Sequence, residues 1–364
     1  MTDKLKVLIL GASYGSLLAT KIVMAGHHVT LVCLPQEADL INREGTTVRF
    51  PIRGRADLLD VRSRDLDGSI SAAVPANVAL KKFHLAVLAM QEPQYASEGL
   101  RDLMSNLARS KLRTMSIMNM PPMTFLRRIP GLSVDALHDC YVAPEVWDRF
   151  DPDLMTLCSP DPQAFRPPEE TLNVLEVTLP TNFKAAAFSK DGDTTILQSL
   201  QADIEAVRFP TAEGSTEVPV KLKVHKSLFV PTAKWAMLLT GNYRCVQKDN
   251  ARSIREAVHS DIEESRAVYA WVQEVCVKLG AAPADLVPFE KYAAAALGLT
   301  RPSSAARALF AGAPNIERVD LLVQKIAAQL GMSNPMLDKT VSTVSHRLEL
   351  NRGERKKTVR ASRA

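Results

Sequence analysis

The first half of the chain has short apolar runs that alternate with amphipathic stretches. Helical spacing of apolar positions occurs at 16–25 and 98–108, and a weaker alternation continues to about Phe209. Strands that alternate with helices in this way predict an α/β fold with a parallel, doubly wound sheet. The apolar runs with the length and aliphatic content of buried strands are 6–10, 28–34, 84–90 and 114–120.

The pattern changes after a polar stretch at 210–219, PTAEGSTEVP. Beyond it, strand-like alternation disappears, and we predict an α/β domain over 1–212 and an all-helical domain over 213–350. The remaining residues, 351–364, hold six lysines and arginines against one glutamate and predict a basic, disordered tail. The segments with helical spacing in the second half are 221–240, 254–279, 288–297 and 318–330.

The turn between the first predicted strand and helix has the position of a dinucleotide-binding loop. Its sequence is GASYGS, and the fingerprint of such loops asks for glycine at the first, third and sixth positions. Gly11 meets the first requirement, whereas serines stand at the other two. Serine is small, and its hydroxyl and N–H groups suit a phosphate. We therefore predict a Rossmann-type domain that binds its cofactor through Gly11, Ala12, Ser13, Tyr14, Gly15 and Ser16.

The end of the second predicted strand does not decide between NAD and NADP. An acidic side chain there accepts a hydrogen bond from the ribose 2′-hydroxyl, and an arginine holds a 2′-phosphate. This chain continues Cys-Leu-Pro-Gln-Glu from Cys33, so neither group stands directly at the strand end. Glu37 and Arg43 are close enough along the chain to reach back, and both cofactors remain open.

Composition narrows the class of protein. Hydrophobic residues make up 46% and charged residues 23% of the 364, as in globular proteins, and the net charge is +5. No apolar run approaches the roughly 18 residues of a membrane span, and no secretory signal is indicated. Five scattered cysteines without a CxxC pair favour reduced thiols and a cytoplasmic protein. We find no zinc-ligand spacing and no nucleic-acid motif, so neither a metal nor a nucleic-acid or membrane partner is predicted.

Two segments carry a resemblance to a known family. GASYGSLLATKIVMAGHHVTLV, at the start, and RPSSAARALFAGAPNIERVDLLVQKIAAQLGMSNPMLD, near the end, resemble ketopantoate reductases (2-dehydropantoate 2-reductases). The resemblance covers nearly the whole chain and implies a Rossmann domain joined to a helical domain. It also implies an active site between the domains and, by family alone, slightly favours NADP.

The resemblance implies further cofactor and substrate residues, with departures. Asn119 stands where the family has an asparagine near the nicotinamide, and Gln91 stands where it usually has a lysine. Ser303 and Ser304 match the family's serines. The opening turn is one residue shorter than the family's usual GAGALG and is closer in spacing to the GxGxGG of opine dehydrogenases.

The catalytic helix of the family has a lysine followed by asparagines four and eight residues later, on one face. Counting back from LLTG places the lysine at Lys226, with Val230 and Lys234 at the asparagine positions. Counting forward from Lys-Leu places it at Lys221, with His225 four residues on. Both registers lose the asparagines.

A later glutamate of the family falls on Asn315, or on Glu317 if the alignment slips by two residues. Lys226, Lys221 or His225 would supply the proton for a developing alkoxide, and Glu317 completes the predicted catalytic set. Lys234 joins Ser303 and Ser304 as a predicted substrate-binding residue.

These observations predict an NAD(P)H-dependent oxidoreductase that acts on a small 2-oxo acid or a related carbonyl compound. One alternative is an opine-type dehydrogenase that condenses an amino acid with a 2-oxo acid, favoured by the GxxxG turn and His225. Another is a catalytically inactive, cofactor-binding sensor or scaffold. By analogy with folds of this kind, the helical domain predicts a homodimer.

Overall fold

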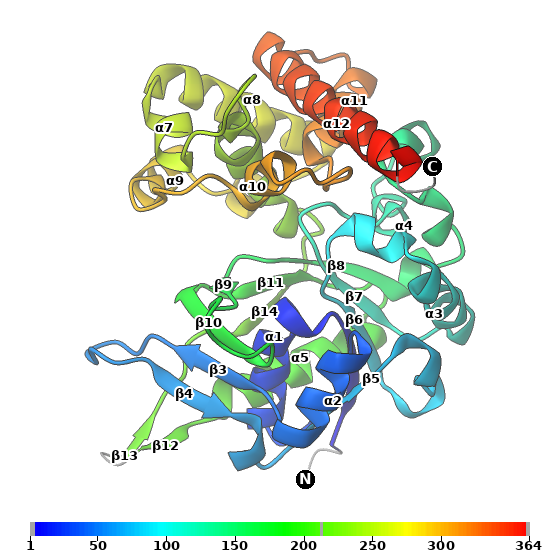
Figure 1. The fold of residues 1–364 in the computed structure, drawn as a ribbon, viewed down its shortest axis with the longest axis vertical. Coiled ribbons are helices and arrows are strands. Elements are labelled where there is room, and N and C mark those ends of the chain that lie inside the picture. The colour runs from blue at the N-terminus through cyan, green and yellow to red at the C-terminus, as the bar shows by residue number, and fades with distance from the viewer. Residues whose placement is uncertain (1–3, 212–213, 362–364) are drawn as a thin grey trace. The chain divides into compact units, whose positions relative to one another are not determined.

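The computed structural model describes residues 4–211 and 214–361. The chain forms two compact units (Figure 1). The first comprises Met1–Met90, Gln94–Arg128 and Glu145–Pro231, and the second comprises Gln91–Pro93, Ile129–Pro144 and Thr232–Ala364. The first is built on β-sheets, and the second is helical.

An eight-stranded sheet forms the centre of the first unit, with the order β14-β11-β8-β7-β6-β1-β2-β5. The six strands from β5 to β8 are parallel, which confirms the predicted parallel sheet and α/β fold. β11 runs antiparallel to β8, and β14 runs parallel to β11. The chain passes from β1 to β2 on one side and on to β6 on the other, so the order reverses at β1. The bounds are β1 Lys6–Leu10, β2 His28–Val32, β5 Ser69–Ala73, β6 Leu85–Leu88, β7 Thr114–Ile117, β8 Met155–Ser159, β11 Phe183–Ala186 and β14 Leu222–His225.

Helix α1 (Ala12–Met24) is buried around almost its whole circumference. A second sheet, of order β4-β3-β10-β9, contacts it through β3, β9 and β10. Residues 15–24 are all buried, including the polar Ser16, Thr20 and Lys21. The bounds in this layer are β3 Thr47–Phe50, β4 Leu59–Arg62, β9 Gln163–Phe165 and β10 Val174–Leu179. The sequence did not predict this layer.

The other elements of the first unit cover the main sheet or extend from it. The helices are α2 Pro35–Glu44, α3 Glu98–Ser110, α4 Met123–Leu126 and α5 Asp191–Ala206, and a small hairpin joins β12 (Phe209–Thr211) to β13 (Gly214–Thr216).

The second unit is a group of packed helices with well-formed ends. Ser253 and Glu256 form a capping box at the start of α7, the Asp261 side chain caps α8, and Gly280 ends α8 in a left-handed conformation. Tyr269 of α8 packs against Phe289 and Tyr292 of α9. The bounds are α6 Lys234–Met237, α7 Ile254–His259, α8 Ile262–Leu279, α9 Phe289–Ala296, α10 Ser304–Phe310, α11 Val319–Gln329 and α12 Pro335–Ala361. No helix in the described part of the chain has the length and apolar character needed to cross a membrane.

Three features differ from the sequence predictions. The helix predicted over 221–240 is wrong for 222–225, because these residues form β14 and pair with β11. The first unit therefore extends beyond residue 212, to Pro231. Residues 351–361 continue α12 instead of forming a disordered tail, and Asn351 donates hydrogen bonds to the carbonyls of Leu309 and Ala313. The last residues of the predicted tail, 362–364, lie outside the described residues.

Candidate functional site

The turn after β1 has the geometry of a dinucleotide loop at its first glycine. Gly11 has φ 104°, and its N–H donates to the Val32 carbonyl over 2.9 Å. A Cβ here would lie 2.5 Å from Met90 Cγ and 2.9 Å from the Ala89 oxygen, so only glycine fits. Gly11 also precedes α1 without a side-chain cap, which leaves the first N–H groups of the helix for an anion.

Gly15 supplies the close contact between helix and strand. A Cβ at Gly15 would lie 2.7 Å from Ile9 Cγ2 and 3.3 Å from Ala89 Cβ. Ser16 is buried instead, and its hydroxyl donates to the Ser13 carbonyl over 2.8 Å, within the helix. The turn is one residue short, so Gly15 performs the packing of the third glycine and Ser16 does not face a ligand. Ser13 is exposed at the helix start.

Two predicted cofactor residues of this turn face the protein. The Tyr14 hydroxyl donates to the Pro162 carbonyl over 2.7 Å, and its ring meets Phe183 edge-on with centroids 5.9 Å apart. Burial raises the pKa of Tyr14 well above its usual range. Ala12 is buried as well. Tyr14 therefore anchors the segment after β8 to the start of α1.

The end of β2 carries an ion pair that sequence reasoning missed. Glu37, in the first turn of α2, is paired with Arg166, which directly follows β9. Arg43, the basic residue considered from the sequence, instead pairs with the adjacent Glu44 over 2.7 Å. Burial raises the pKa of the neighbouring Cys33 to about 12, so this thiol is protonated at neutral pH. No sequence signal links residues 37 and 166, because the second sheet brings them together.

Two buried polar atoms lie at the carboxyl ends of β7 and β8. Asn119 Oδ1 and Ser159 Oγ are both buried, with no hydrogen-bond partner among the described residues. The two strands are parallel neighbours, with Ile117 opposite Cys158. Buried polar atoms are normally paired, so two such atoms on one edge suit a ligand amide. Gln91, predicted beside Asn119, is exposed and belongs to the second unit.

Of the three residues predicted as proton donors, His225 ends the outermost strand, β14, and Lys221 and Lys226 directly flank it, so none of them lies on a helix. β14 is five strand positions from β1, a separation of roughly 24 Å at about 4.8 Å per strand. Because β14 runs opposite to β8, its last residue, His225, and the following Lys226 lie toward the edge where the parallel strands begin. Ligands of such sheets bind at the opposite, carboxyl edge. Lys221, before β14, pairs with Glu217 over 2.5 Å.

A helical segment over 231–245 carries Lys234 in its first α-helical turn, and its residues from Thr232 onward belong to the second unit. Asn242 stands eight residues later, and Leu238 occupies the position four residues on. The lysine-to-asparagine spacing of the resemblance is thus present, in a register that the sequence comparison did not use.

A π turn over Leu238–Asn242 interrupts this segment, with the Tyr243 N–H bonded to the Leu238 carbonyl. An α turn takes 3.6 residues and an i→i+5 turn takes roughly one more, so eight residues complete about two turns. Lys234 and Asn242 therefore lie on about the same side of the segment.

Gly241, inside the π turn, lies against Tyr292. A Cβ at Gly241 would overlap the Tyr292 hydroxyl, which donates to the Met237 carbonyl over 3.0 Å. Gly241 thus admits Tyr292, and Tyr292 satisfies a carbonyl of the irregular segment.

Ser303 and Glu317 both contact this segment. The Ser303 hydroxyl donates to the Asn242 carbonyl over 2.7 Å and accepts from the Ala306 N–H, so it caps α10 and holds Asn242 in place. Ser304 is exposed. The backbone carbonyl of Glu317 accepts from the Tyr243 hydroxyl. Its buried carboxylate receives the Glu92 N–H over 3.4 Å.

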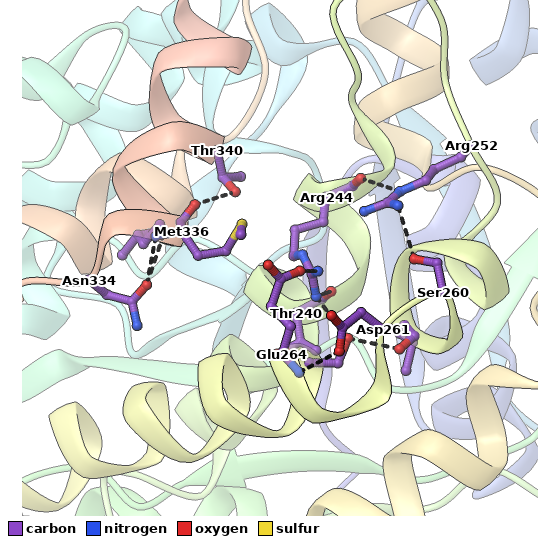
Figure 2. A network of polar contacts seen from close by, with 12 residues as sticks. Thr240, Arg244, Arg252, Ser260, Asp261, Glu264, Asn334, Met336 and Thr340 are labelled. Carbon is purple, nitrogen blue, oxygen red and sulfur yellow. Dashed lines mark hydrogen bonds and ion pairs between the residues drawn. The ribbon is translucent and has the colours of Figure 1, made fainter.

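A buried arginine fixes the far end of the segment (Figure 2). Arg244 pairs with Glu264 and donates to Ser265 Oγ over 2.8 Å and to the Thr240 carbonyl over 3.3 Å. Arg252 in turn donates to the Arg244 carbonyl over 3.0 Å. The Arg244 side chain is 4% exposed and that of Glu264 is 37% exposed, and the bond to the Thr240 carbonyl joins this network to the segment that carries Asn242.

Within the described residues, no group of three or more potential ligands is arranged to hold a metal ion. The candidate residues form two separate sets, the dinucleotide loop in the first unit and Lys234 with Asn242 in the second.

No family model and no curated protein matches the sequence. Solved structures match over nearly the whole chain, among them ketopantoate reductase family structures, which confirms the resemblance at the level of fold.

Three of these structures illustrate the match. A 2-dehydropantoate 2-reductase of Methylococcus capsulatus has a TM-score of 0.65 at 12% identity, covering 95% of this chain and 96% of its own. A dimeric ketopantoate reductase of Staphylococcus aureus has a TM-score of 0.59 at 11% identity, covering 95% and 100%. D-mandelate dehydrogenase with NADH has a TM-score of 0.59 at 13% identity, covering 94% and 99%.

Proposed function

We propose that this protein is an NAD(P)H-dependent reductase of a small 2-oxo acid. The observation that carries the proposal is the loop from Gly11 to Gly15, which is built for close approach of a dinucleotide at the carboxyl end of β1. β1 is where the strand order reverses, and open α/β sheets bind their ligands at such points.

The residues of the first unit fit the cofactor in two places. The uncapped N–H groups at the start of α1 and the exposed Ser13 suit the pyrophosphate. Asn119 Oδ1 and Ser159 Oγ suit the carboxamide of the nicotinamide, because both are buried and lack a partner among the described residues. A dihydronicotinamide bound at these residues would supply the hydride for the carbonyl carbon.

We assign the role of proton donor to Lys234. Its place eight residues before Asn242, on about the same side of the segment, suits a cation that protonates an alkoxide beside an amide that orients the substrate. Glu317 is buried against the same segment and suits a substrate-orienting role. Ser303 acts through Asn242 and is a positioning residue.

The opine-type alternative rested on the GxxxG turn and on His225 as a proton donor. His225 lies at the end of the outermost strand, on the edge of the sheet opposite to the one where ligands bind. We therefore propose reduction without a condensing amine. Localisation in the cytoplasm stays part of the proposal, and so does a homodimer, because a Staphylococcus aureus reductase with this fold is dimeric. Light scattering of the purified protein tests the dimer.

Turnover with a panel of 2-oxo acids, with and without added amines, tests the proposal. Lys234→Ala is expected to lower kcat by about 10²–10⁴-fold while NAD(P)H binding stays unchanged, because only the proton donor is lost. Lys248→Ala, an exposed residue of the same unit, is the matched control.

The variant Lys226→Ala distinguishes the register that places the catalytic lysine at Lys226 from the one that places it at Lys234. Full activity of this variant supports Lys234, and a loss equal to that of Lys234→Ala contradicts the assignment. Cofactor binding without turnover of any 2-oxo acid would favour a sensor or scaffold, and strict dependence on an amine would favour the opine reaction.

A further inference from the structure

The Glu37–Arg166 ion pair lies where the adenosine ribose of a dinucleotide is recognised, just beyond the end of β2. Glu37 and Arg166 both act electrostatically on Cys33, the residue that follows β2. The inference drawn from this pair rests on the proposed function, because it concerns the cofactor of that site.

The two partners present different groups to a ligand. The Glu37 side chain is 11% exposed and that of Arg166 is 24% exposed, so the guanidinium is the outer member. One Glu37 oxygen already receives an N–H of Arg166. A guanidinium has five N–H donors, and within 4–211 and 214–361 Glu37 is its one hydrogen-bond acceptor. Donors are therefore left for a second anion.

The backbone around the pair also favours an anion. Helix α2 begins at Pro35 with Leu34 as its N-cap residue, which provides no side-chain hydrogen bond. The N–H groups of the first turn and the helix dipole then face the end of β2 with a partial positive charge.

Arg166 is held in place from two directions. Glu37 fixes its guanidinium, and the Tyr14 hydroxyl fixes the segment before β9 by bonding to the Pro162 carbonyl over 2.7 Å. A charged group that is ordered before the ligand arrives loses less freedom on binding.

We propose that Arg166, held by Glu37 at the start of α2, binds the 2′-phosphate of NADPH and makes NADPH the preferred cofactor. An NAD-specific site needs an acidic side chain that is free to accept a hydrogen bond from the ribose 2′-hydroxyl. Here Glu37 is already paired with Arg166, which is the more exposed of the two side chains. Arginine suits phosphate because its planar fork donates two hydrogen bonds at once. Arg166 thus takes the role that the residues directly after β2 lack.

Fluorescence titration of the full-length protein with NADPH and with NADH tests this assignment. We expect the wild type to bind NADPH at least about tenfold more tightly than NADH. Arg166→Gln is expected to raise the Kd for NADPH by about 30-fold and to change the Kd for NADH less than about twofold. Arg53→Gln, an exposed arginine of the same unit, is expected to change neither.

A second variant guards against a folding defect. Arg166→Gln alone leaves Glu37 without its charge partner, whereas the double variant Glu37→Gln, Arg166→Gln removes both charges and keeps two side chains that can bond to each other. It is expected to lose the preference for NADPH as well.

Three results would overturn the inference. These are NADH binding as tightly as NADPH to the wild type, an unchanged preference in both variants, and a loss of affinity for NADH equal to that for NADPH. If the folded wild type binds neither dinucleotide, the proposed function fails together with the inference.

Discussion

Lys21 carries a buried amino group in the middle of α1, and this burial disfavours the charged form of the side chain. It is 3% exposed, donates to the Val218 carbonyl over 2.7 Å, and lies 5.7 Å from the Phe50 ring centroid. Desolvation lowers the pKa of Lys21 from 10.5 to about 7. The ammonium therefore ties α1 to the chain before β14, at the price of a charge that the fold disfavours.

Stability should rise with pH above neutrality because of this residue. Between a folded pKa of about 7 and an unfolded pKa of 10.5, the unfolded chain holds a proton that the folded chain has released. The free energy of unfolding then rises with pH, by at most about 1.4 kcal/mol per unit. Lys21→Met should remove this slope, so the difference between variant and wild type changes between pH 7 and 9 in urea unfolding. Identical pH dependence in both proteins would contradict the shifted pKa.

Single residues also show why sequence reasoning located one part of the site and missed the other. The Gly11 requirement could be predicted, because a tight turn between strand and helix needs positive φ. The Glu37–Arg166 pair could not, because the residues are 129 positions apart and meet only through a sheet that gave no clear periodic signal.

At the scale of elements, the π turn decides which residues of the helical segment share a side. The family pattern, a lysine with asparagines four and eight residues later, applies to a regular helix. Neither register considered from the sequence keeps these asparagines. Lys234 and Asn242 lie on about the same side of the segment because the π turn adds a residue. β14 was mistaken for a helix because a four-residue strand is too short to separate alternation from helical spacing.

Gly241 and Tyr292 should behave as a coupled pair. Gly241→Ala should lower the free energy of unfolding by about 2 kcal/mol or more, because the new methyl overlaps the Tyr292 hydroxyl. Tyr292→Phe should cost about 1 kcal/mol by losing the bond to the Met237 carbonyl. The double variant should cost less than the sum, because the new Cβ would lie 3.3 Å from Cζ of the remaining ring. Additive losses in urea unfolding would mean that the hydroxyl is not what excludes a side chain at Gly241.

At the scale of the whole molecule, the chain consists of two units with separate tasks. All residues proposed to contact the dinucleotide lie in the first unit, and those proposed for proton transfer and substrate lie in the second. The tryptophans divide in the same way, with Trp147 in the first unit and Trp235 and Trp271 in the second. The fluorescence of each unit can therefore be followed separately.

NADPH should stabilise the first unit more than the second. A ligand that binds only the folded state at 100 times its Kd adds about 2.7 kcal/mol. The transition reported by Trp147, in a Trp235→Phe, Trp271→Phe variant, should move to higher temperature by a few degrees. The transition reported by Trp235 and Trp271, in a Trp147→Phe variant, should move less, because the proposed cofactor contacts lie outside that unit. Equal shifts would show that the two units unfold together, and a larger shift in the second unit would place the cofactor contacts there.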